Sequence, residues 1–424
     1  MSSQLLSCPS CAGKVALRSD ATETLVCPSC GVLCDVTARG LVFVAPAGLR
    51  RQPDLPLGVT GELFGDHYEL IGWVMRACTV DSEEYAWSEY LLQGEHGYRW
   101  LSECEGHWIF LEPLSASQVS TTRWDQPVRV GGVAHRHFQR SERVGYKAMQ
   151  GEFYWQIRSD DVATLDDYIA PSRIACREAV AGDVQWTLGQ HVLARELWRS
   201  FKAPGSPPRQ YGVGPCQPNL QLTAAPRMLR QAGLFGALLI AVAVLLSAAL
   251  PRASALTTQI ELSPSSPIYL SPVFEITSST HAAELEARVL GDLREVLEPG
   301  TSEAWLGVDM ALIEDRSGKS DAISFDLYQP LDGSASEGEL EHSERVGSIQ
   351  PGRYLLRVES TTPPSVTGSA RLQVSVTHGV FLWFPLWLAL GLIAVAPLVV
   401  FARGHLFERR RWEDSDYPGG SSEG

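Results

Sequence analysis

Two long apolar runs stand out from the hydrophobic pattern of this 424-residue chain. Residues 232–250 (AGLFGALLIAVAVLLSAAL) and 380–402 (VFLWFPLWLALGLIAVAPLVVFA) contain no charged side chain. A helix rises about 1.5 Å per residue, so runs of this length approach the ~30 Å hydrocarbon core of a bilayer. Helices buried in soluble proteins usually interrupt their apolar face with polar residues, whereas membrane helices tolerate prolines such as Pro385 and Pro397. We therefore expect transmembrane helices over residues 229–250 and 380–402.

Short segments with alternating apolar and polar residues occupy the chain before the first run. Between residues 60 and 202 they are rich in Trp and Tyr and are separated by regular turn signals, which is typical of an antiparallel meander or a small barrel. We expect these aromatic side chains to fill a core, with a ligand-binding aromatic surface as the alternative; they are Trp73, Trp87, Tyr90, Trp100 and Trp108. Residues 194–202 space Leu197, Trp198 and Phe201 along one face of a short helix.

The segment between the two runs, residues 251–379, alternates in the same way and predicts an antiparallel β-sandwich. Proline and glycine punctuate the rest of the chain. Residues 49–62 read as a linker, and residues 203–228 (203–226 contain six prolines) read as an extended tether to the membrane.

Basic residues beside the apolar runs indicate the orientation of the two helices. Arg227 and Arg230 precede the first run, and a basic cluster follows the second: Arg403, His405, Arg409, Arg410 and Arg411. Only Arg252 lies close to the opposite ends. Because positive charge favours the cytoplasmic side, we expect both termini in the cytoplasm and residues 251–379 outside. The sequence thus predicts a protein that crosses the cell inner membrane twice, with the first span as its signal-anchor.

Cysteine usage and charge agree with this orientation. All nine cysteines precede the first run, where a reducing cytoplasm keeps thiols free, and the outer segment has none. The net charge of −14 is concentrated in residues 251–379, which hold nine Lys and Arg against nineteen Asp and Glu. An acidic outer domain favours solubility and disfavours adsorption to anionic lipid.

The clearest chemical signal is a pair of C-x-x-C motifs. Cys8-Pro-Ser-Cys11 and Cys27-Pro-Ser-Cys30 are separated by fifteen residues, a spacing that lets four thiolates meet on one tetrahedral Zn²⁺. A redox motif is the rival interpretation, but it needs a single C-x-x-C at a helix start. We predict a structural zinc ribbon over residues 1–45 because four thiolates leave no open position for water. Cys34 is a spare buried residue or a substitute ligand.

The ribbon lacks the features of a nucleic-acid binder. In residues 1–50 a few basic residues are balanced by acidic ones, and Phe43 is the only aromatic residue. There is neither a basic patch nor a stacking platform. We expect the ribbon to stabilise the fold or to contact another protein, and nucleic-acid binding is the alternative.

Several runs in the β-rich module resemble the bacterial family called domain of unknown function 4178 (DUF4178). They are Trp87-Ser-Glu-Tyr-Leu-Leu92, Trp100-Leu101, Gly106-His-Trp108, Gly151-Glu-Phe-Tyr-Trp155, Tyr168-Ile-Ala-Pro171, Glu178 and Trp186-Thr-Leu-Gly189. The resemblance covers roughly residues 60–205. It implies a membrane-associated protein with a zinc ribbon in an envelope or stress-related setting, and it implies no activity.

Three groups in the module contain residue types that serve in catalytic or metal-binding sites. His135 and His137 share one strand face but lack a further ligand at suitable spacing, so we expect them to face solvent. Glu89 would be an acid or base if buried, but we expect it to pair with Arg99 or to face water. An aspartate cluster is expected to form a solvated face or a helix cap: Asp160, Asp161, Asp166 and Asp167. The chain has no P-loop, G-x-S-x-G, H-E-x-x-H or G-x-G-x-x-G motif.

The predicted organisation is therefore a zinc ribbon (1–45), a β-rich module (60–202), a linker (203–228), a first membrane helix (229–250), an outer sandwich (251–379), a second membrane helix (380–402) and a cytosolic tail (403–424). With no catalytic constellation, the sequence favours a non-enzymatic scaffold or signal-coupling protein. Such a protein would bind protein partners on both membrane faces. The alternative from a different class is a membrane-tethered enzyme whose active site lies in the β-rich module.

Overall fold

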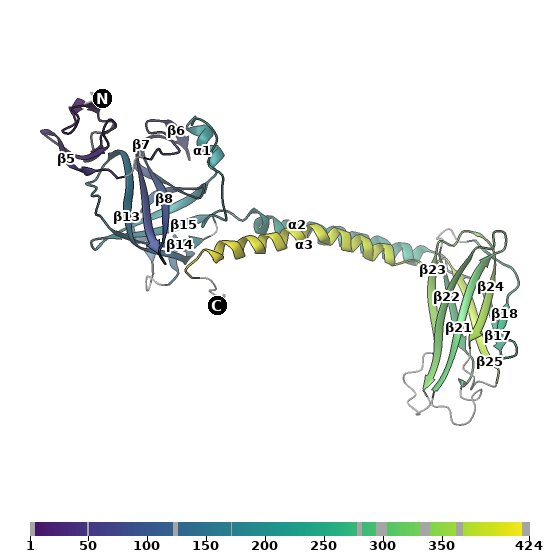
Figure 1. Ribbon diagram of the computed structural model, residues 1–424. Coiled ribbons are helices and arrows are strands. Elements are labelled where there is room, and N and C mark those ends of the chain that lie inside the picture. Colours follow the sequence, from purple (N-terminus) through teal and green to yellow (C-terminus); the bar gives the residue numbers. More distant parts are fainter. Residues whose placement is uncertain are drawn as a thin grey trace. The chain divides into compact units, whose positions relative to one another are not determined.

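The computed structural model describes residues 5–48, 51–121, 126–170, 172–277, 282–293, 303–330, 340–361 and 368–417. The chain forms two compact units (Figure 1). The first contains residues 1–226 and 399–424, and the second contains residues 227–398. Strands predominate in both units, as the alternating segments predicted.

An eight-stranded antiparallel barrel is the centre of the first unit. Its strands are connected in the order β13, β14, β15, β16, β10, β9, β8 and β7, and pairing of β7 with β13 closes the ring. Closure leaves none of these eight strands at a free edge. The bounds are β7 (Asp66–Val80), β8 (Glu83–Gly94), β9 (Gly97–Cys104), β10 (His107–Leu114), β13 (Val133–Phe153), β14 (Ala163–Ala170), β15 (Arg173–Val180) and β16 (Asp183–Val192).

One interaction identifies the inner face of the barrel. Arg76 on β7 donates a hydrogen bond to Glu178 on β15 over 2.8 Å. Strands β13 and β14 separate β7 from β15 in the ring, so these side chains can meet only across the interior. Because strand residues alternate between faces, Trp73 on β7 and Tyr90 on β8 lie on the outer face.

The outer face of the barrel is covered by apolar elements. Helix α1 (Ala194–Ser200) and β6 (Thr60–Leu63) pack with Trp73, Tyr90 and Trp108 into a buried cluster. This confirms the predicted amphipathic helix and the core role of these three aromatics, whereas Trp87 and Trp100 are only partly buried. A short hairpin of β11 (Val119–Ser120) and β12 (Val128–Val130), preceded by the 3-10 helix η1 (Ala116–Gln118), covers another part of the wall.

Both predicted linkers pack against the barrel where they are described. In residues 51–59, Leu55 is fully buried in the cluster beneath α1, so this stretch is not a free linker. In the proline-rich segment, Cys216 is buried beside Phe138 of β13. His107 Nε2 also lies 2.8 Å from the carbonyl oxygen of Tyr211. Residues 51–59 and 203–219 lack regular structure, yet their apolar residues add to the barrel core, whereas residues 220–228 of the predicted second linker are helical.

The cysteine-rich N-terminus is joined to the barrel through a continuous sheet. Strands β1 (Leu5–Ser7) and β2 (Lys14–Ala16) form a hairpin, and β3 (Thr24–Val26), β4 (Val32–Thr37) and β5 (Gly40–Pro46) extend from the end of β13. Gly151 pairs with both Gly72 of β7 and Val26 of β3. Its φ is +89°, and a Cβ there would lie 2.1 Å from the Ile71 carbonyl oxygen, so only glycine fits this junction.

The second unit contains two antiparallel sheets that share one apolar core. The four-stranded sheet contains β17 (Ala253–Leu262), β25 (Ala370–His378), β20 (Ala282–Val289) and β23 (Glu341–Gly347). The five-stranded sheet contains β18 (Ile268–Leu270), β24 (Gly352–Thr361), β21 (Glu303–Glu314), β22 (Ser320–Pro330) and β19 (Phe274–Ile276). We call this part the two-sheet domain. Its alternation buries one face of each sheet, as the sequence pattern of residues 251–379 predicted.

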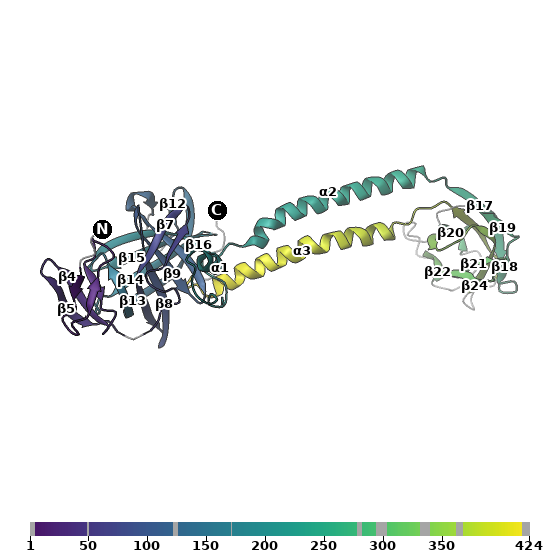
Figure 2. The same cartoon turned by 90° about the horizontal axis from the view of Figure 1, so that it is seen from above.

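Two long apolar helices complete the chain, α2 (Leu220–Ala249) and α3 (Phe384–Glu413) (Figure 2). Both are long and apolar enough to cross a membrane. Their apolar side chains point outward rather than into a protein core: Leu245 is 69 % exposed and Leu392 is 66 % exposed. Within the second unit the two helices approach each other, since a Cβ on Gly236 would lie 3.3 Å from Leu390.

Candidate metal centre and barrel interior

The four cysteines of the two C-x-x-C motifs lie together in space. Their sulfur atoms all fall within 4.8 Å of one another. The Sγ atoms of Cys8 and Cys30 are 3.7 Å apart, and those of Cys11 and Cys27 are 3.8 Å apart. Four thiolates around a tetrahedral ion with bonds of about 2.3 Å would have sulfurs roughly 3.8 Å apart. The donor set therefore has the geometry of a tetrahedral metal centre.

The two motifs adopt matching turns, which explains their common sequence. The amide of Ala12 donates to the carbonyl of Cys8, and the amide of Gly31 donates to the carbonyl of Cys27. Ala12 and Gly31 occupy equivalent left-handed positions, with φ of +59° and +74°. Cys34 does not belong to the cluster of four and is fully buried, where burial raises its pKa to about 12. It has the role of a small core residue.

Buried polar contacts attach the cysteine-rich segment to the barrel. The carboxylate of Glu152, at the end of β13, accepts hydrogen bonds from the amides of Arg18 and Ser19 and from the Thr22 hydroxyl. Glu152 is only 5 % exposed, so these donors replace the water it loses on burial. The cysteine-rich segment is thus part of the barrel unit and not a separate domain.

A charged cluster occupies the barrel interior. The guanidinium of Arg76 contacts Glu178 at 2.8 Å and Glu89 at 3.6 Å, and it lies 5.4 Å from the ring centroid of Tyr146. The Arg76 side chain is 5 % exposed, whereas the Glu89 and Glu178 side chains keep 18 % and 34 % of their surface accessible. The Trp87 indole donates to Glu89 over 2.8 Å. A single cation is therefore shared by two carboxylates from opposite parts of the wall.

Proton affinities in this cluster depart from their usual values. Burial alone would lower the pKa of Arg76, but Glu89 and Glu178 raise it, so this cation stays charged. Burial raises the pKa of Glu89 even though Arg76 acts in the opposite direction. Burial also raises the pKa of Asp167 on β14 from 3.8 to about 6 and the pKa of its neighbour Cys176 well above 9.0. Carboxyl groups with raised pKa values can exchange protons near neutral pH.

The structure corrects three expectations drawn from sequence. Glu89 pairs with Arg76 and not with Arg99, which instead contacts Glu112 at 3.1 Å. His135 and His137 do not face solvent, because they are 1 % and 6 % exposed. Covering segments that the local pattern does not reveal bury these histidines.

The aspartate cluster is a solvated face only in part, because Asp160 is exposed as expected whereas Asp166 is buried. Asp166 is fully buried and is bound by Arg177 at 2.9 Å and by Arg140 at 3.5 Å. Burial would raise its pKa, but the hydrogen bond to His137 and the two arginines together hold the pKa of Asp166 below its usual value. Asp166 and Asp167 point to opposite faces of β14, and Asp161 makes a local bond to the Arg158 amide.

Comparison with known proteins places the barrel in a family. Residues 56–194 match the model of the family described as Domain of unknown function (DUF4178). This segment is a DUF4178 domain. The match spans all eight barrel strands, and it confirms the resemblance seen in the runs between Trp87 and Gly189.

No curated protein matches the chain. Among solved structures, PNGF-II is 8 % identical, with 74 % of this chain and 68 % of that chain covered and a TM-score of 0.20. The CBM22-1–CBM22-2 tandem domain of Paenibacillus barcinonensis Xyn10C is 9 % identical, with coverage of 75 % and 98 % and a TM-score of 0.19. Likeness at this level carries no argument about fold or function.

Proposed function

We propose that this chain is a two-span inner-membrane protein that couples its two-sheet domain outside the cell to its DUF4178 barrel in the cytoplasm. The exposed apolar surface of α2 and α3 supports the membrane assignment, because a soluble protein rarely leaves such large apolar faces in water. The arginines in the first part of α2, Arg227 and Arg230, and those at the end of α3 support the orientation. In this proposal the protein is a scaffold or signal-coupling component that binds protein partners on both faces, and it is not an enzyme.

The observation that carries the coupling role is the attachment of α3 to the barrel. Helix α3 runs without interruption for 30 residues, from the apolar span to Glu413. Near its end, Arg411 is 1 % exposed and donates to the carbonyl oxygens of Pro215 and Gln217, in the segment that leads into α2. Asn219, just before α2, donates to the carbonyl of Gly404 on α3 over 2.9 Å. The barrel-side ends of both helices are therefore tied to each other.

The residues after α3 bind directly to the barrel wall. The Ser415 hydroxyl donates to the carbonyl of Phe138 on β13, and the Asp416 carboxylate accepts from the Arg140 amide. Trp412 packs edge-on against Phe138. A displacement of α3 along or about its axis would act on β13, the strand that contacts β3, β7, β12 and β14. This arrangement gives membrane helix movement a route to the barrel.

We further propose that the four-cysteine centre holds a structural Zn²⁺. Cys8, Cys11, Cys27 and Cys30 would supply all four ligands, and a closed tetrahedral thiolate set suits zinc and leaves no site for water. The metal would fix the β1–β2 hairpin against β3–β5 at the edge of the barrel. Metal analysis of the purified protein should give one zinc per chain, and Cys27→Ser should abolish it.

The orientation can be tested with thiol labelling in intact spheroplasts. Cys104 is exposed on the barrel, and Ser265→Cys would place an exposed thiol on the cysteine-free two-sheet domain. A membrane-impermeant maleimide should label the engineered thiol before lysis and Cys104 only after lysis. The opposite pattern would reverse the assignment.

Coupling is tested by comparing the cytoplasmic neighbours of four proteins. A proximity-labelling enzyme fused to the N-terminus would report neighbours for the wild-type chain, for a chain with residues 253–378 replaced by a short linker, and for Arg411→Ala. We expect both altered proteins to lose the same neighbours, while Arg410→Ala, which changes an exposed arginine on the same helix, keeps them. Identical neighbours in all four proteins would refute coupling.

The charged barrel interior supports a second candidate, a membrane-tethered enzyme. Glu89 has a raised pKa beside the charged Arg76, and Asp167 on β14 also has a raised pKa. Carboxyl groups with shifted pKa values can act as acid–base catalysts. If the barrel is catalytic, a gene that carries Glu89→Gln should fail to complement a deletion strain. The variant protein should nevertheless keep the wild-type unfolding midpoint and the wild-type cytoplasmic neighbours. Full complementation by Glu89→Gln would leave coupling as the sole function.

A further inference from the structure

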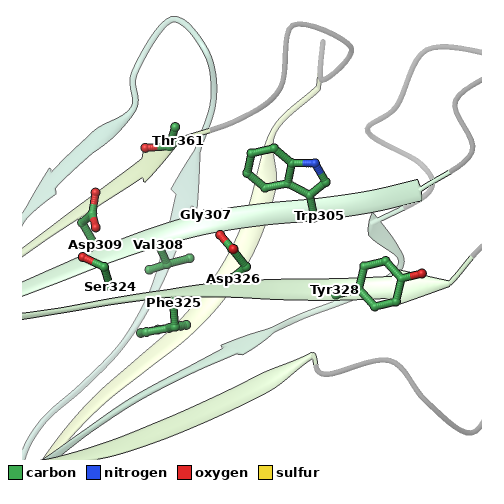
Figure 3. A pocket seen from close by; sticks show the side chains of 9 residues that line it. All are labelled: Trp305, Gly307, Val308, Asp309, Ser324, Phe325, Asp326, Tyr328 and Thr361. Atoms are coloured by element: carbon green, nitrogen blue, oxygen red, sulfur yellow. The ribbon is translucent and has the colours of Figure 1, made fainter.

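A hollow lies on the outward face of the five-stranded sheet, over β21 and β22. Core residues of β21 and β22 alternate with outward ones, so Trp305, Gly307 and Asp309 on β21 lie on the side away from the core. Their register partners on β22 are Tyr328, Asp326 and Ser324. These residues line a cavity of about 470 Å³ (Figure 3). This volume is in the range that binds small organic ligands.

Gly307 makes the floor of this hollow. A Cβ at this position would lie 3.1 Å from the carbonyl oxygen of Thr361 on β24 and 3.2 Å from a carboxylate oxygen of Asp326. A side chain here would fill the space between the aromatic pair and the polar residues. The missing side chain therefore keeps the backbone accessible to a ligand.

The lining divides into an aromatic end and a polar end. Trp305 and Tyr328 are directly opposite each other and partly exposed, although large aromatic side chains usually gain stability by burial. Asp326, Ser324 and Asp309 continue from them along the strands. From Trp305 to Asp309 the row is about 13 Å long, at about 3.3 Å per residue. An extended ligand with an apolar face and several hydroxyl groups fits this row better than a compact ion does.

We propose that this hollow is a binding site for a neutral oligosaccharide. The C–H face of a sugar ring would stack on Trp305 or Tyr328, and its hydroxyl groups would donate to the carboxylates of Asp309 and Asp326 and bond to Ser324. Carboxylates in the site, on an already acidic domain, oppose anionic polysaccharides. This proposal assigns a ligand class to the two-sheet domain and does not depend on membrane orientation. An experiment that refutes sugar binding therefore leaves the coupling proposal untouched, and the reverse also holds.

Saturation-transfer difference NMR on the full-length protein in nanodiscs provides the test, since it detects weak sugar binding to large particles. The probes are maltotetraose, cellotetraose and triacetylchitotriose, with tetramethylammonium as a cation probe and a galacturonic acid trimer as an anion probe. We expect at least one neutral oligosaccharide to give a signal that Trp305→Ala reduces at least tenfold. Asp326→Asn and Gly307→Val should also reduce it, and Trp305→Phe should restore part of it.

Tyr85→Ala, which removes an exposed aromatic side chain from the barrel, is the matched control and should leave the signal unchanged. Asp326→Asn keeps the shape of the site and so remains informative if Trp305→Ala is unstable. Binding of tetramethylammonium or of the acidic trimer in place of all three neutral sugars would overturn the proposal. So would the absence of any signal, or a sugar signal that persists in Trp305→Ala, Asp326→Asn and Gly307→Val.

Discussion

Replacing Asp167 by asparagine should stabilise the barrel in a strongly pH-dependent way. Burial raises the pKa of this carboxyl from 3.8 to about 6. The folded state therefore holds its proton more tightly than the unfolded state does. Below pH 4 both states are protonated and the group costs nothing. Above pH 6 both are ionised, and the folded state has lost about 3 kcal/mol, at about 1.4 kcal/mol for each unit of the shift. Asp167→Asn removes this penalty because asparagine cannot ionise.

The assay is thermal unfolding of the full-length protein in nanodiscs, followed by tryptophan fluorescence at pH 4.5 and pH 8. For a unit of this size, 1 kcal/mol moves the midpoint by roughly 2–4 °C, so the gain at pH 8 should be up to about 10 °C. At pH 4.5, between the two pKa values, the gain should fall to about a third of that value. Asp183→Asn, an exposed aspartate of the same barrel, is the control and should have no pH-dependent effect. An equal gain at both pH values would show that the carboxyl is not held in a charge-excluding interior.

The remaining predictions concern the metal centre, the charged cluster and the junction glycine. Chelation of zinc, or Cys8→Ser, should lower the thermal unfolding midpoint of the barrel unit. Either change should also remove one zinc per chain, measured by mass spectrometry of the metal. An unchanged midpoint would show that the metal does not stabilise the fold. Arg76→Ala should destabilise the barrel by about 3–5 kcal/mol because it removes the buried cation that two partly buried carboxylates share. Arg99→Ala, whose partner Glu112 is exposed, should cost under about 1 kcal/mol in the same denaturation assay. Gly151→Ala should destabilise more than Gly97→Ala, since both have positive φ but only Gly151 meets a backbone oxygen; equal losses would rule out the steric reason.

Much of the local structure follows from the sequence alone. The uninterrupted apolar runs predict the apolar parts of helices α2 and α3, whereas the runs do not reveal that α2 already begins at Leu220 and that α3 continues to Glu413. The paired C-x-x-C turns bring four thiols together, because each turn is a local structure and a short hairpin carries one to the other. Alternating residues in the β-rich segments determine which side chains share a face, since strand geometry repeats every two residues.

Tertiary structure decided which of those faces lies inside and what covers the other. The sequence predicts that Glu89 pairs with Arg99 or faces water, but ring closure by β7 and β13 puts it inside the barrel with Arg76 and Glu178. The latter two residues are 102 positions apart in sequence. His137 and Asp166 carry the pattern of a solvated surface, yet distant segments bury them, including the residues after α3. The local sequence does not reveal burial by remote segments. Alternation shows on which face of a strand a residue lies, but it does not show which part of the chain covers that face. The charged interior and the attachment of α3 to β13 are therefore properties of the closed fold.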